Sequence, residues 1–322
     1  MTRMIVGVIR GGTSGEYPLS LKTGAAILNA LPEERYETRD ILIDKTGTWH
    51  LRGMPSTPTR ALSQLDVVLN ALHGGVGEDG TVQRLLDQMA IPYAGARPTA
   101  SSIALNKVRA RETLRAAGVR MPRAVSFSAQ NVQTAPDMAR SVFTQFGPPY
   151  IVKPSSEGAG RGIRVASGII ELPDAIADVM ESFGNVLVEE YIRGQEASVG
   201  VIEGFRNEQL YVLPPAHVKR TGPHLNFEMH ESGAIEHSVP SSFTHIQKLN
   251  IEDIARVAHT ALGISHFSRS DVIVTPHAVY LLEVNTTPGL YPGASFPQML
   301  ESVGSSVTEF LEHAISLARS HR

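Results

Sequence analysis

Cysteine is absent from this 322-residue sequence. The absence excludes disulfides, thiolate metal sites and cysteine nucleophiles, and it fits a reducing compartment. No apolar run reaches the about 18 residues that a membrane-spanning helix needs. The apolar stretch before Arg10 is also too short for a signal peptide. We therefore expect a soluble, cytoplasmic protein with no membrane partner.

Long runs of one charge are also missing. The 29 basic and 32 acidic residues leave a net charge of -3, so we expect no nucleic-acid partner. The phosphate loop G-x-x-x-x-G-K-[ST] and the dinucleotide fingerprint G-x-G-x-x-G do not occur. A nucleotide, if one is bound, must be held by another fold, and an oxidoreductase on a Rossmann fold is disfavoured.

The length and the 42% content of apolar residues predict two or three compact units. Near the N-terminus, the apolar run Met4 to Ile9 leads into a glycine-rich turn that ends at Glu16. A second run, Asp66 to Leu72, leads into another glycine-rich turn that begins at His73. This pattern predicts an open parallel α/β sheet with both turns at the carboxyl ends of strands, where ligands bind. We place this first domain at residues 1–97.

The rest of the chain predicts two α+β units. In residues 98–185, a helix from Ser101 to Ala117 precedes a strand, loop and strand around Gly158, Gly160 and Gly162. Glycines at alternate positions free backbone N–H groups to wrap an anion. Residues 186–322 are expected to contain several strands, a β-hairpin and two final helices.

The expected hairpin joins two β-branched runs, Val272 to Val274 and Val279 to Leu282, through a short turn. Asp271 on the first strand and Glu283 with Asn285 on the second could converge at one end. A hard cation such as Mg²⁺ prefers these oxygen ligands. Alternatively, the carboxylates merely flank the strands and Asn285 caps the following loop. The hairpin alone favours neither interpretation.

Other charged residues have the same ambiguity. Lys107 and Lys153 could each meet a phosphate, and Glu189 and Glu196 could meet an adenine amino group and a ribose. Taken singly, such residues are more commonly solvated surface charges.

Five motifs that occur in a fixed order favour ligand-binding roles for these residues over solvated surface positions. They are Gly11-Gly-Thr-Ser-Gly-Glu16, His73-Gly-Gly-Val-Gly-Glu-Asp-Gly80, Val152-Lys-Pro-Ser155, the segment from Val188 to Glu196, and Glu283-Val-Asn-Thr-Thr-Pro-Gly289. The chain resembles the D-alanine–D-alanine ligases, a family of ATP-grasp enzymes, over nearly its whole length. The resemblance implies a three-domain ATP-grasp fold in which the central α+β unit is a lid. It also implies ATP-dependent joining of two D-alanines through D-alanyl phosphate for peptidoglycan, and a homodimer formed through the first domain.

The resemblance assigns roles residue by residue. It implies Asp271, Glu283 and Asn285 as ligands of Mg²⁺ (or Mn²⁺), and Lys107 and Lys153 as contacts of the ATP phosphates. Glu189 and Glu196 match the adenine and ribose contacts, and Tyr191-Ile192 the segment facing the purine. Glu16 matches the residue that holds the first amino acid's ammonium, and His73 a histidine beside that substrate. Arg269 and the backbone of Gly289 match the groups that stabilise the oxyanion.

Three positions depart from the family pattern. Ala159-Gly160 replaces a serine pair, His230-Glu231 stands in a loop that usually carries Lys-Tyr, and a substrate-binding serine maps to Ala294, with Ser295 adjacent. We favour an exposed loop position for His230, although its charge near neutral pH could help select an acceptor. The losses cluster on the acceptor side, so another amino acid or a hydroxy acid is an alternative second substrate. A catalytically silent nucleotide-binding protein is a further alternative, against which the presence of Arg269 argues.

Overall fold

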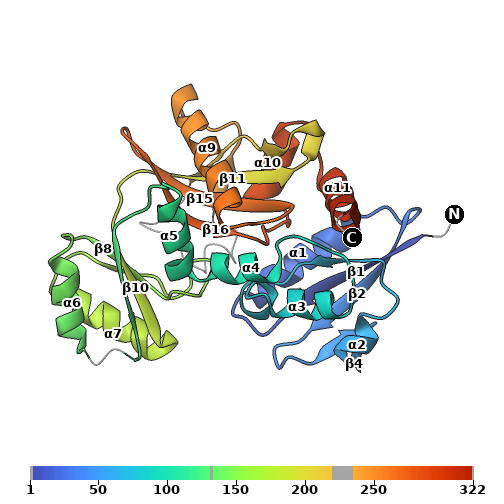
Figure 1. Ribbon diagram of the computed structural model, residues 1–322, viewed down its shortest axis with the longest axis horizontal. Helices are drawn as coiled ribbons and strands as arrows, with labels where there is room; N and C mark the ends of the chain where they lie inside the picture. Colours follow the sequence, from blue (N-terminus) through green and yellow to red (C-terminus); the bar gives the residue numbers. More distant parts are fainter. Residues whose placement is uncertain (1–2, 131–132, 220–234, 321–322) are drawn as a thin grey trace.

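The computed structural model describes residues 3–130, 133–219 and 235–320. Three β-sheets organise the chain into three regions (Figure 1). The first region is blue, the small central region is green, and the third runs from yellow to red above the other two. In the part of the chain that is described, no helix is both long and apolar enough to cross a membrane.

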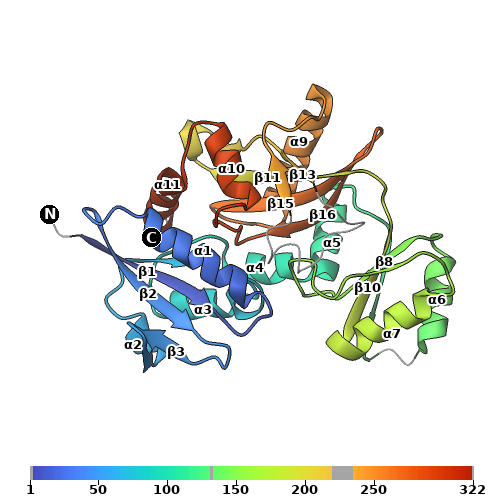
Figure 2. The ribbon, with the colours of Figure 1, turned by 180° about the vertical axis from the view of Figure 1, so that it is seen from behind.

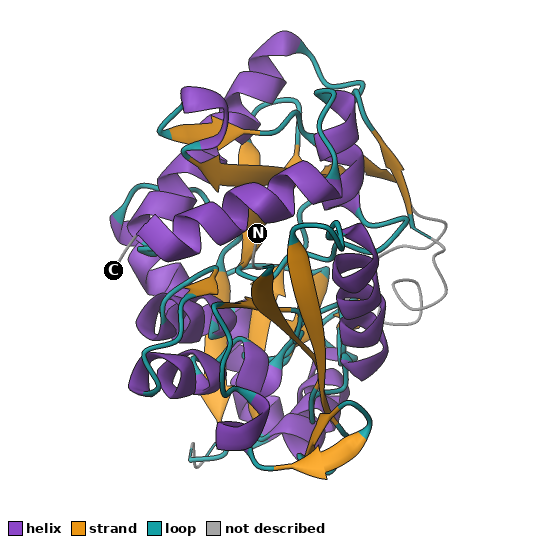
Figure 3. Cartoon of the chain, turned by 90° about the vertical axis from the view of Figure 1, so that its right-hand side faces the viewer, coloured by secondary structure: helices purple, strands orange, loops and turns teal. Residues whose placement is uncertain are grey.

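The first sheet has the order β4-β3-β2-β1-β5-β6. Strands β2, β1, β5 and β6 run parallel, and β3 and β4 add an antiparallel edge. Helices lie on both sides of this sheet (Figure 3). The elements are β1 (Met4–Gly11), α1 (Tyr17–Ala30), β2 (Tyr36–Ile43), β3 (Trp49–Leu51), β4 (Met54–Ser56), α2 (Pro58–Ala61), β5 (Val67–Asn70), η1 (Gly75–Gly77), α3 (Thr81–Gln88) and β6 (Tyr93–Ala94).

Because β1 and β5 are paired in parallel, both predicted glycine-rich turns lie at the carboxyl ends of neighbouring strands, on the same side of the sheet. The Ser14 hydroxyl of the first turn donates to the carbonyl of His73 in the second, at 2.5 Å. Gly74 has a φ of 63° and leaves room for Glu16, whose Oε1 would lie 2.7 Å from a Cβ atom at that position. The two turns that are predicted to bind a ligand are therefore closely packed against each other.

The central sheet is antiparallel, with the order β7-β10-β8-β9. Its apolar core is its own and includes Phe127, Val142, Tyr150 and Ile176. The elements are β7 (Ala124–Ser128), α6 (Ala135–Phe143), β8 (Tyr150–Lys153), β9 (Arg164–Ala166), α7 (Leu172–Phe183) and β10 (Asn185–Glu190).

The expected domain boundaries at 97 and 185 remain a prediction, and two structural details bear on where each segment packs. Strand β10 pairs with β7 and β8 of the central sheet, whereas the expected boundary places residues from 186 onward in the third unit. The single helix expected from Ser101 to Ala117 is two helices, α4 (Pro98–Leu105) and α5 (Lys107–Ala116). Asn106 separates them because its side chain accepts the N–H groups of Val108 and Arg109, as an N-cap does. Both helices pack in the core of the third sheet.

The third sheet has the order β14-β13-β11-β15-β16, and β12 pairs with β11 outside this path. Its elements are β11 (Gln195–Glu203), η2 (Phe205–Asn207), β12 (Leu210–Val212), β13 (Ala216–Lys219), β14 (Glu236–Ser238), α9 (His245–Ala261), β15 (Phe267–Val274), β16 (Val279–Asn285), α10 (Ser295–Ser302) and α11 (Val307–Ser320). Helix α11 lies beside α1 of the first region (Figure 2). One apolar core accordingly joins the first region, through Val6 and Val8, to Phe296 and Phe310 of the third.

The hairpin of β15 and β16 forms as predicted, with a turn closed by the Thr275 N–H donating to the Ala278 carbonyl at 2.9 Å. A β-bulge interrupts its register: Asp271 pairs with Glu283, but the next residue, Val272, pairs with Leu281. Because side chains alternate along a strand, the extra residue returns Val284 to the apolar side and turns Glu283 toward the opposite face. The sequence pattern did not predict this bulge.

Candidate active site

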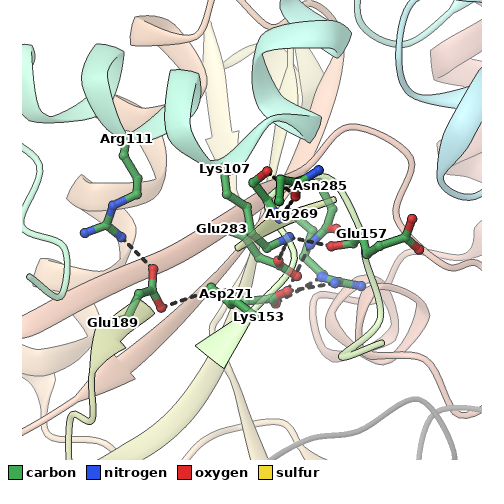
Figure 4. A network of polar contacts seen from close by, with 11 residues as sticks. Lys107, Arg111, Lys153, Glu157, Glu189, Arg269, Asp271, Glu283 and Asn285 are labelled. Carbon is green, nitrogen blue, oxygen red and sulfur yellow. Dashed lines mark hydrogen bonds and ion pairs between the residues drawn. The ribbon is translucent and has the colours of Figure 1, made fainter. Parts of the chain in front are cut away.

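A cavity of about 210 Å³ lies where the three regions meet. Every site residue predicted from the sequence lines it: Glu16, His73, Lys107, Lys153, Glu189, Tyr191, Ile192, Glu196, Arg269, Asp271, Glu283, Asn285, Gly289, Ala294 and Ser295. The His230-Glu231 pair lies outside the described residues. Segments far apart in the chain thus contribute to one site, and Figure 4 shows its charged centre.

On the hairpin side of the cavity, three other side chains donate hydrogen bonds to Asp271. Its carboxylate accepts two bonds from Arg269, at 3.0 Å from Nε and 2.7 Å from Nη2, and one from Asn285 Nδ2 at 2.9 Å. The Ser198 hydroxyl on β11 donates to Asp271 Oδ1 at 2.6 Å. Arg269 and Asp271 share one face of β15 because they are two residues apart, and the register places Asn285 opposite Arg269.

Glu283 lies opposite Asp271 and completes the predicted set of oxygen donors. Although burial alone would raise it, the pKa of Glu283 is held at about 2 by Lys107 and Lys153. Among the described residues no cluster of three His, Asp or Glu side chains could hold a metal ion. Two carboxylates with one amide nevertheless fit a hard divalent cation that keeps further positions for substrate oxygens. Asn285 would have to present its oxygen rather than its nitrogen.

Each predicted phosphate lysine is paired with a carboxylate. Lys107 begins α5, and its Nζ lies 3.1 Å from Glu283 Oε2 and 2.6 Å from the carbonyl of Glu157. Lys153 ends β8, and its Nζ lies 2.7 Å from Glu189 Oε2. Both lysines line the cavity and come from different elements, and Figure 4 shows them beside their carboxylate partners.

Glu16 and His73 form the side of the cavity that belongs to the first region. Burial, together with the neighbouring Glu78 and Glu283, raises the pKa of Glu16 to about 8. Burial and the nearby Arg269 lower the pKa of His73 to about 4, so the imidazole is neutral at pH 7. The Thr23 hydroxyl lies 2.8 Å from His73 Nε2. An ammonium group placed beside Glu16 would favour its ionised form.

The glycine-rich loop after Lys153 covers this side. A Cβ atom on Gly158 would lie 2.6 Å from Glu16 Oε1, so a larger residue would force the loop or the Glu16 carboxylate to shift. Ala159 has a φ of 50°, in the region that favours glycine. The guanidinium of Arg161 in turn lies over Gly15, where a Cβ atom would be 2.3 Å from its Nη1. The loop of the central region thus packs against both Gly15 and Glu16 of the first region.

The residues predicted to contact the nucleotide and the acceptor also line the cavity. Tyr191 and Ile192 follow β10, Glu196 lies on β11, and all three line the cavity. Ala294 precedes α10 and Ser295 begins it. Between them and the hairpin, Tyr291 packs so close to Gly289 that a Cβ atom there would lie 2.8 Å from the ring. Gly289 consequently has to be glycine while Tyr291 holds this position.

Sequence reasoning missed three residues that support the site. Arg111 on α5 contacts Glu189 at 2.7 Å. Buried Glu78 accepts the N–H of Gly74 at 2.7 Å and that of Thr287 at 3.2 Å. Glu78 stands in the second glycine motif, which gave a signal that it matters but not which group it binds. Ser198 and Arg111 stand in no motif, and no sequence signal points to either.

Three β-sheets around one cavity that contains paired lysines and carboxylates fit the ATP-grasp ligases, which the sequence motifs resemble. The profile of the D-ala D-ala ligase C-terminus matches residues 113–316, and that of the N-terminus matches residues 50–96. The D-alanine–D-alanine ligase of Carboxydothermus hydrogenoformans is 32% identical over 322 residues, which cover 99% of each protein. The chain therefore belongs to the D-alanine–D-alanine ligase family, whose members are ATP-dependent carboxylate–amine ligases that use a divalent metal ion.

Solved structures agree with this assignment. The D-alanyl-alanine synthetase A of Vibrio cholerae is 25% identical with a TM-score of 0.85, covering 99% of this chain and all 100% of that chain. The VanG D-Ala:D-Ser ligase of Enterococcus faecalis is 24% identical with a TM-score of 0.84, covering 98% of this chain and 100% of its own, and it shows a likeness of fold alone. The predicted family, ATP-grasp fold and enzyme class are confirmed.

Proposed function

We propose that this enzyme joins two D-alanine molecules to form D-alanyl-D-alanine for peptidoglycan synthesis. One observation carries the proposal. The cavity brings two lysines, an arginine and an oxygen-donor set within reach of Glu16, which can hold an ammonium group. Membership of the D-alanine–D-alanine ligase family supports the choice of substrate.

The first step makes a poor electrophile reactive. A carboxylate oxygen of the first D-alanine attacks the γ-phosphorus of ATP, giving D-alanyl phosphate and ADP. Lys107 and Lys153 neutralise the phosphate oxygens, while Tyr191, Ile192, Glu189 and Glu196 hold the adenosine. A divalent cation held by Asp271, Glu283 and Asn285, Mg²⁺ or Mn²⁺, would supply further positive charge to the phosphates.

In the second step the amine of the acceptor attacks the acyl carbon. Arg269 and the Gly289 N–H stabilise the negative charge that develops on the carbonyl oxygen. Inorganic phosphate then leaves, the amine loses its proton, and an amide bond remains. Glu16 orients the ammonium of the first D-alanine, and neutral His73 lies beside it. The loop over Glu16 keeps water from the acyl phosphate.

A coupled assay tests this function. With ATP, MgCl₂ and millimolar D-alanine, we expect phosphate release together with a product of the mass of the dipeptide. The same reaction with MnCl₂ compares the two metal ions. Phosphate release no higher than in a blank without D-alanine would contradict the proposal, and nucleotide binding without ligation would favour a silent nucleotide-binding protein.

A different acceptor is the second candidate, and Ala294 is the observation that favours it. Ala294 is buried at the cavity, where the family resemblance leads us to expect a serine for the acceptor's carboxylate. Ser295, the next residue, is also buried there and offers a hydroxyl. Product masses after incubation with D-alanine plus a mixture of D-amino acids and D-hydroxy acids would identify the preferred acceptor.

We further propose a homodimer formed through the first region and a cytoplasmic location, where ATP is available. Light scattering on the purified protein tests the oligomeric state. A mass of about twice 34.8 kDa is expected, and a mass equal to one chain would contradict a dimer.

A further inference from the structure

Glu189 is bound by two cations rather than one. Lys153 Nζ lies 2.7 Å from Oε2, and Arg111 Nη1 lies 2.7 Å from Oε1 (Figure 4). The three side chains are almost completely buried, with exposed fractions of 8% for Lys153, 6% for Arg111 and 3% for Glu189. Each oxygen of the carboxylate thus has its own cation.

The two cations differ in what else they can reach. Lys153 lines the cavity, whereas Arg111 does not belong to its lining. Arg111 lies on α5, and a second hydrogen bond, from its Nη2 to the carbonyl of Pro122, holds its side chain in place. Lys153 can therefore turn toward a ligand, and Arg111 cannot.

Such a departure of Lys153 would normally be costly. A carboxylate that loses its only counter-ion in a buried site keeps the full penalty of an uncompensated charge. A lysine held by such a carboxylate is correspondingly hard to remove. With Arg111 in place, Glu189 keeps one charge-assisted bond after Lys153 has left.

We propose that Arg111 is a positioning residue for ATP binding: it stays on Glu189 as a permanent counter-ion and so allows Lys153 to pass from Glu189 to the phosphates. This role rests on the proposed function, in which Lys153 binds phosphate. Arg111 acts through Lys153 and touches neither nucleotide nor substrate.

The test compares nucleotides that differ in phosphate content. Dissociation constants for ATP, ADP, AMP and adenosine are measured with MgCl₂ and without D-alanine, for the wild type and Arg111→Met. Competition with a fluorescent ATP analogue extends the measurement to the weaker ligands. We expect Arg111→Met to weaken ATP binding about tenfold or more, as for loss of a charge-assisted bond, and to change adenosine binding less than about twofold.

Matched variants separate this role from a general loss of structure. Arg109→Met makes the same replacement at an exposed position of α5 and should bind ATP as the wild type does. Arg111→Lys keeps a cation and should recover part of the affinity, which also covers the case that Arg111→Met fails to fold. Adding Arg111→Met to Glu189→Gln should weaken ATP binding little beyond the effect of Glu189→Gln alone, because the carboxylate that Arg111 neutralises is no longer there.

Each contrary result has a distinct meaning. Equal losses for adenosine and ATP would show that Arg111 orients the base contact, and unchanged ATP binding in Arg111→Met would show that Lys153 needs no such partner. Either result overturns the role of Arg111 and leaves the proposed function standing. Failure of the wild type to bind ATP would overturn the proposed function itself, and with it this role.

Discussion

At the scale of single residues, the lysines and the arginine of the site are each paired with a carboxylate. Lys107 is paired with Glu283, Lys153 with Glu189, and Arg269 with Asp271. Buried charges are tolerated in proteins when they are paired. Under the proposed function, an incoming nucleotide would exchange partners with the lysines instead of meeting unpaired charges, and the carboxylates left behind would need other cations.

The raised pKa of Glu16 predicts how stability depends on pH. An ordinary carboxyl titrates near 4.5, whereas Glu16 in the folded protein titrates at about 8. The folded state thus binds the proton more tightly, so this contribution to stability is complete below the unfolded pKa and is lost as pH rises toward 8. Glu16→Gln removes the titration and should not show that loss.

Thermal melts of both proteins between pH 5 and pH 9, without ligands, measure the difference. We expect the wild type to lose a few degrees in melting temperature relative to Glu16→Gln across this range. Parallel pH profiles for the two proteins would mean that Glu16 is already ionised near pH 5.

Glu78 predicts a separate defect in the chemical step. It links the second glycine-rich turn to Thr287, which lies two residues before the Gly289 N–H proposed to stabilise the oxyanion. Glu78→Gln has the same shape but replaces one acceptor oxygen by a donor. We expect kcat to fall about 10- to 100-fold, the effect of one lost charged hydrogen bond, with the Kd for ATP unchanged.

Steady-state kinetics with D-alanine and calorimetry with ATP provide the two values. Asp87→Asn, an exposed carboxylate on α3, is the matched control and should behave as the wild type. A normal kcat in Glu78→Gln would show that the loop through Gly289 is ordered without this bond.

The residues that the sequence predicted and those it missed differ in a physical way. Lys153 stands in a short motif, and Asp271 and Glu283 face one another across one hairpin, so local pattern pointed to them. Arg111 is 78 positions from Glu189, and Glu78 is 209 positions from Thr287. Contacts of that kind are created by packing between regions, and no local pattern records them.

At the scale of elements, the hairpin illustrates the same limit. Its two strands and its turn were predicted from β-branched runs and Thr275-Pro276-His277, because pairing and turn chemistry are local. The bulge before Glu283 follows from the core on the other side, which takes both Leu281 and Val284. The break between α4 and α5 was also missed, since Asn106 reads as an ordinary helical residue until its capping bonds are seen.

The glycine-rich loop after β8 supports a prediction that concerns one element. Gly158→Ala would place a methyl group 2.6 Å from Glu16 Oε1, so either the loop or the carboxylate must shift. We expect the KM for D-alanine to rise and kcat to fall, together by about tenfold or more in kcat/KM, because a small misplacement of the reacting groups is costly. Steady-state kinetics measure both constants.

Gly168→Ala is the control, because a Cβ atom at Gly168 meets nothing within 4 Å. It should keep wild-type kinetics, and both variants should melt close to the wild type. If Gly158→Ala were as active as Gly168→Ala, the approach of the loop to Glu16 would have no part in the reaction.

At the scale of the whole molecule, the three regions are joined unequally. The first and third share one apolar core through Val8, Phe296 and Phe310, whereas the central region has a core of its own. At the cavity the central region contacts its neighbours through the Glu157 carbonyl, which accepts from Lys107, and through the close approach of Gly158 to Glu16. The fold and family could be predicted from ordered motifs, but this unequal joining depends on which apolar faces meet in space.

Nucleotide binding should therefore act on the cavity and leave the shared core unchanged. In hydrogen exchange with ATP and MgCl₂, we expect slower exchange in residues 150–163 and in the hairpin of β15 and β16. At a ligand concentration of 100 times Kd, openings that require release of ATP slow by up to about 100-fold. Peptides from α11, which packs in the shared core, serve as the internal control and should exchange at an unchanged rate. Protection that extended to α11 would contradict this prediction, because it would mean that binding also changes the packing between the first and third regions.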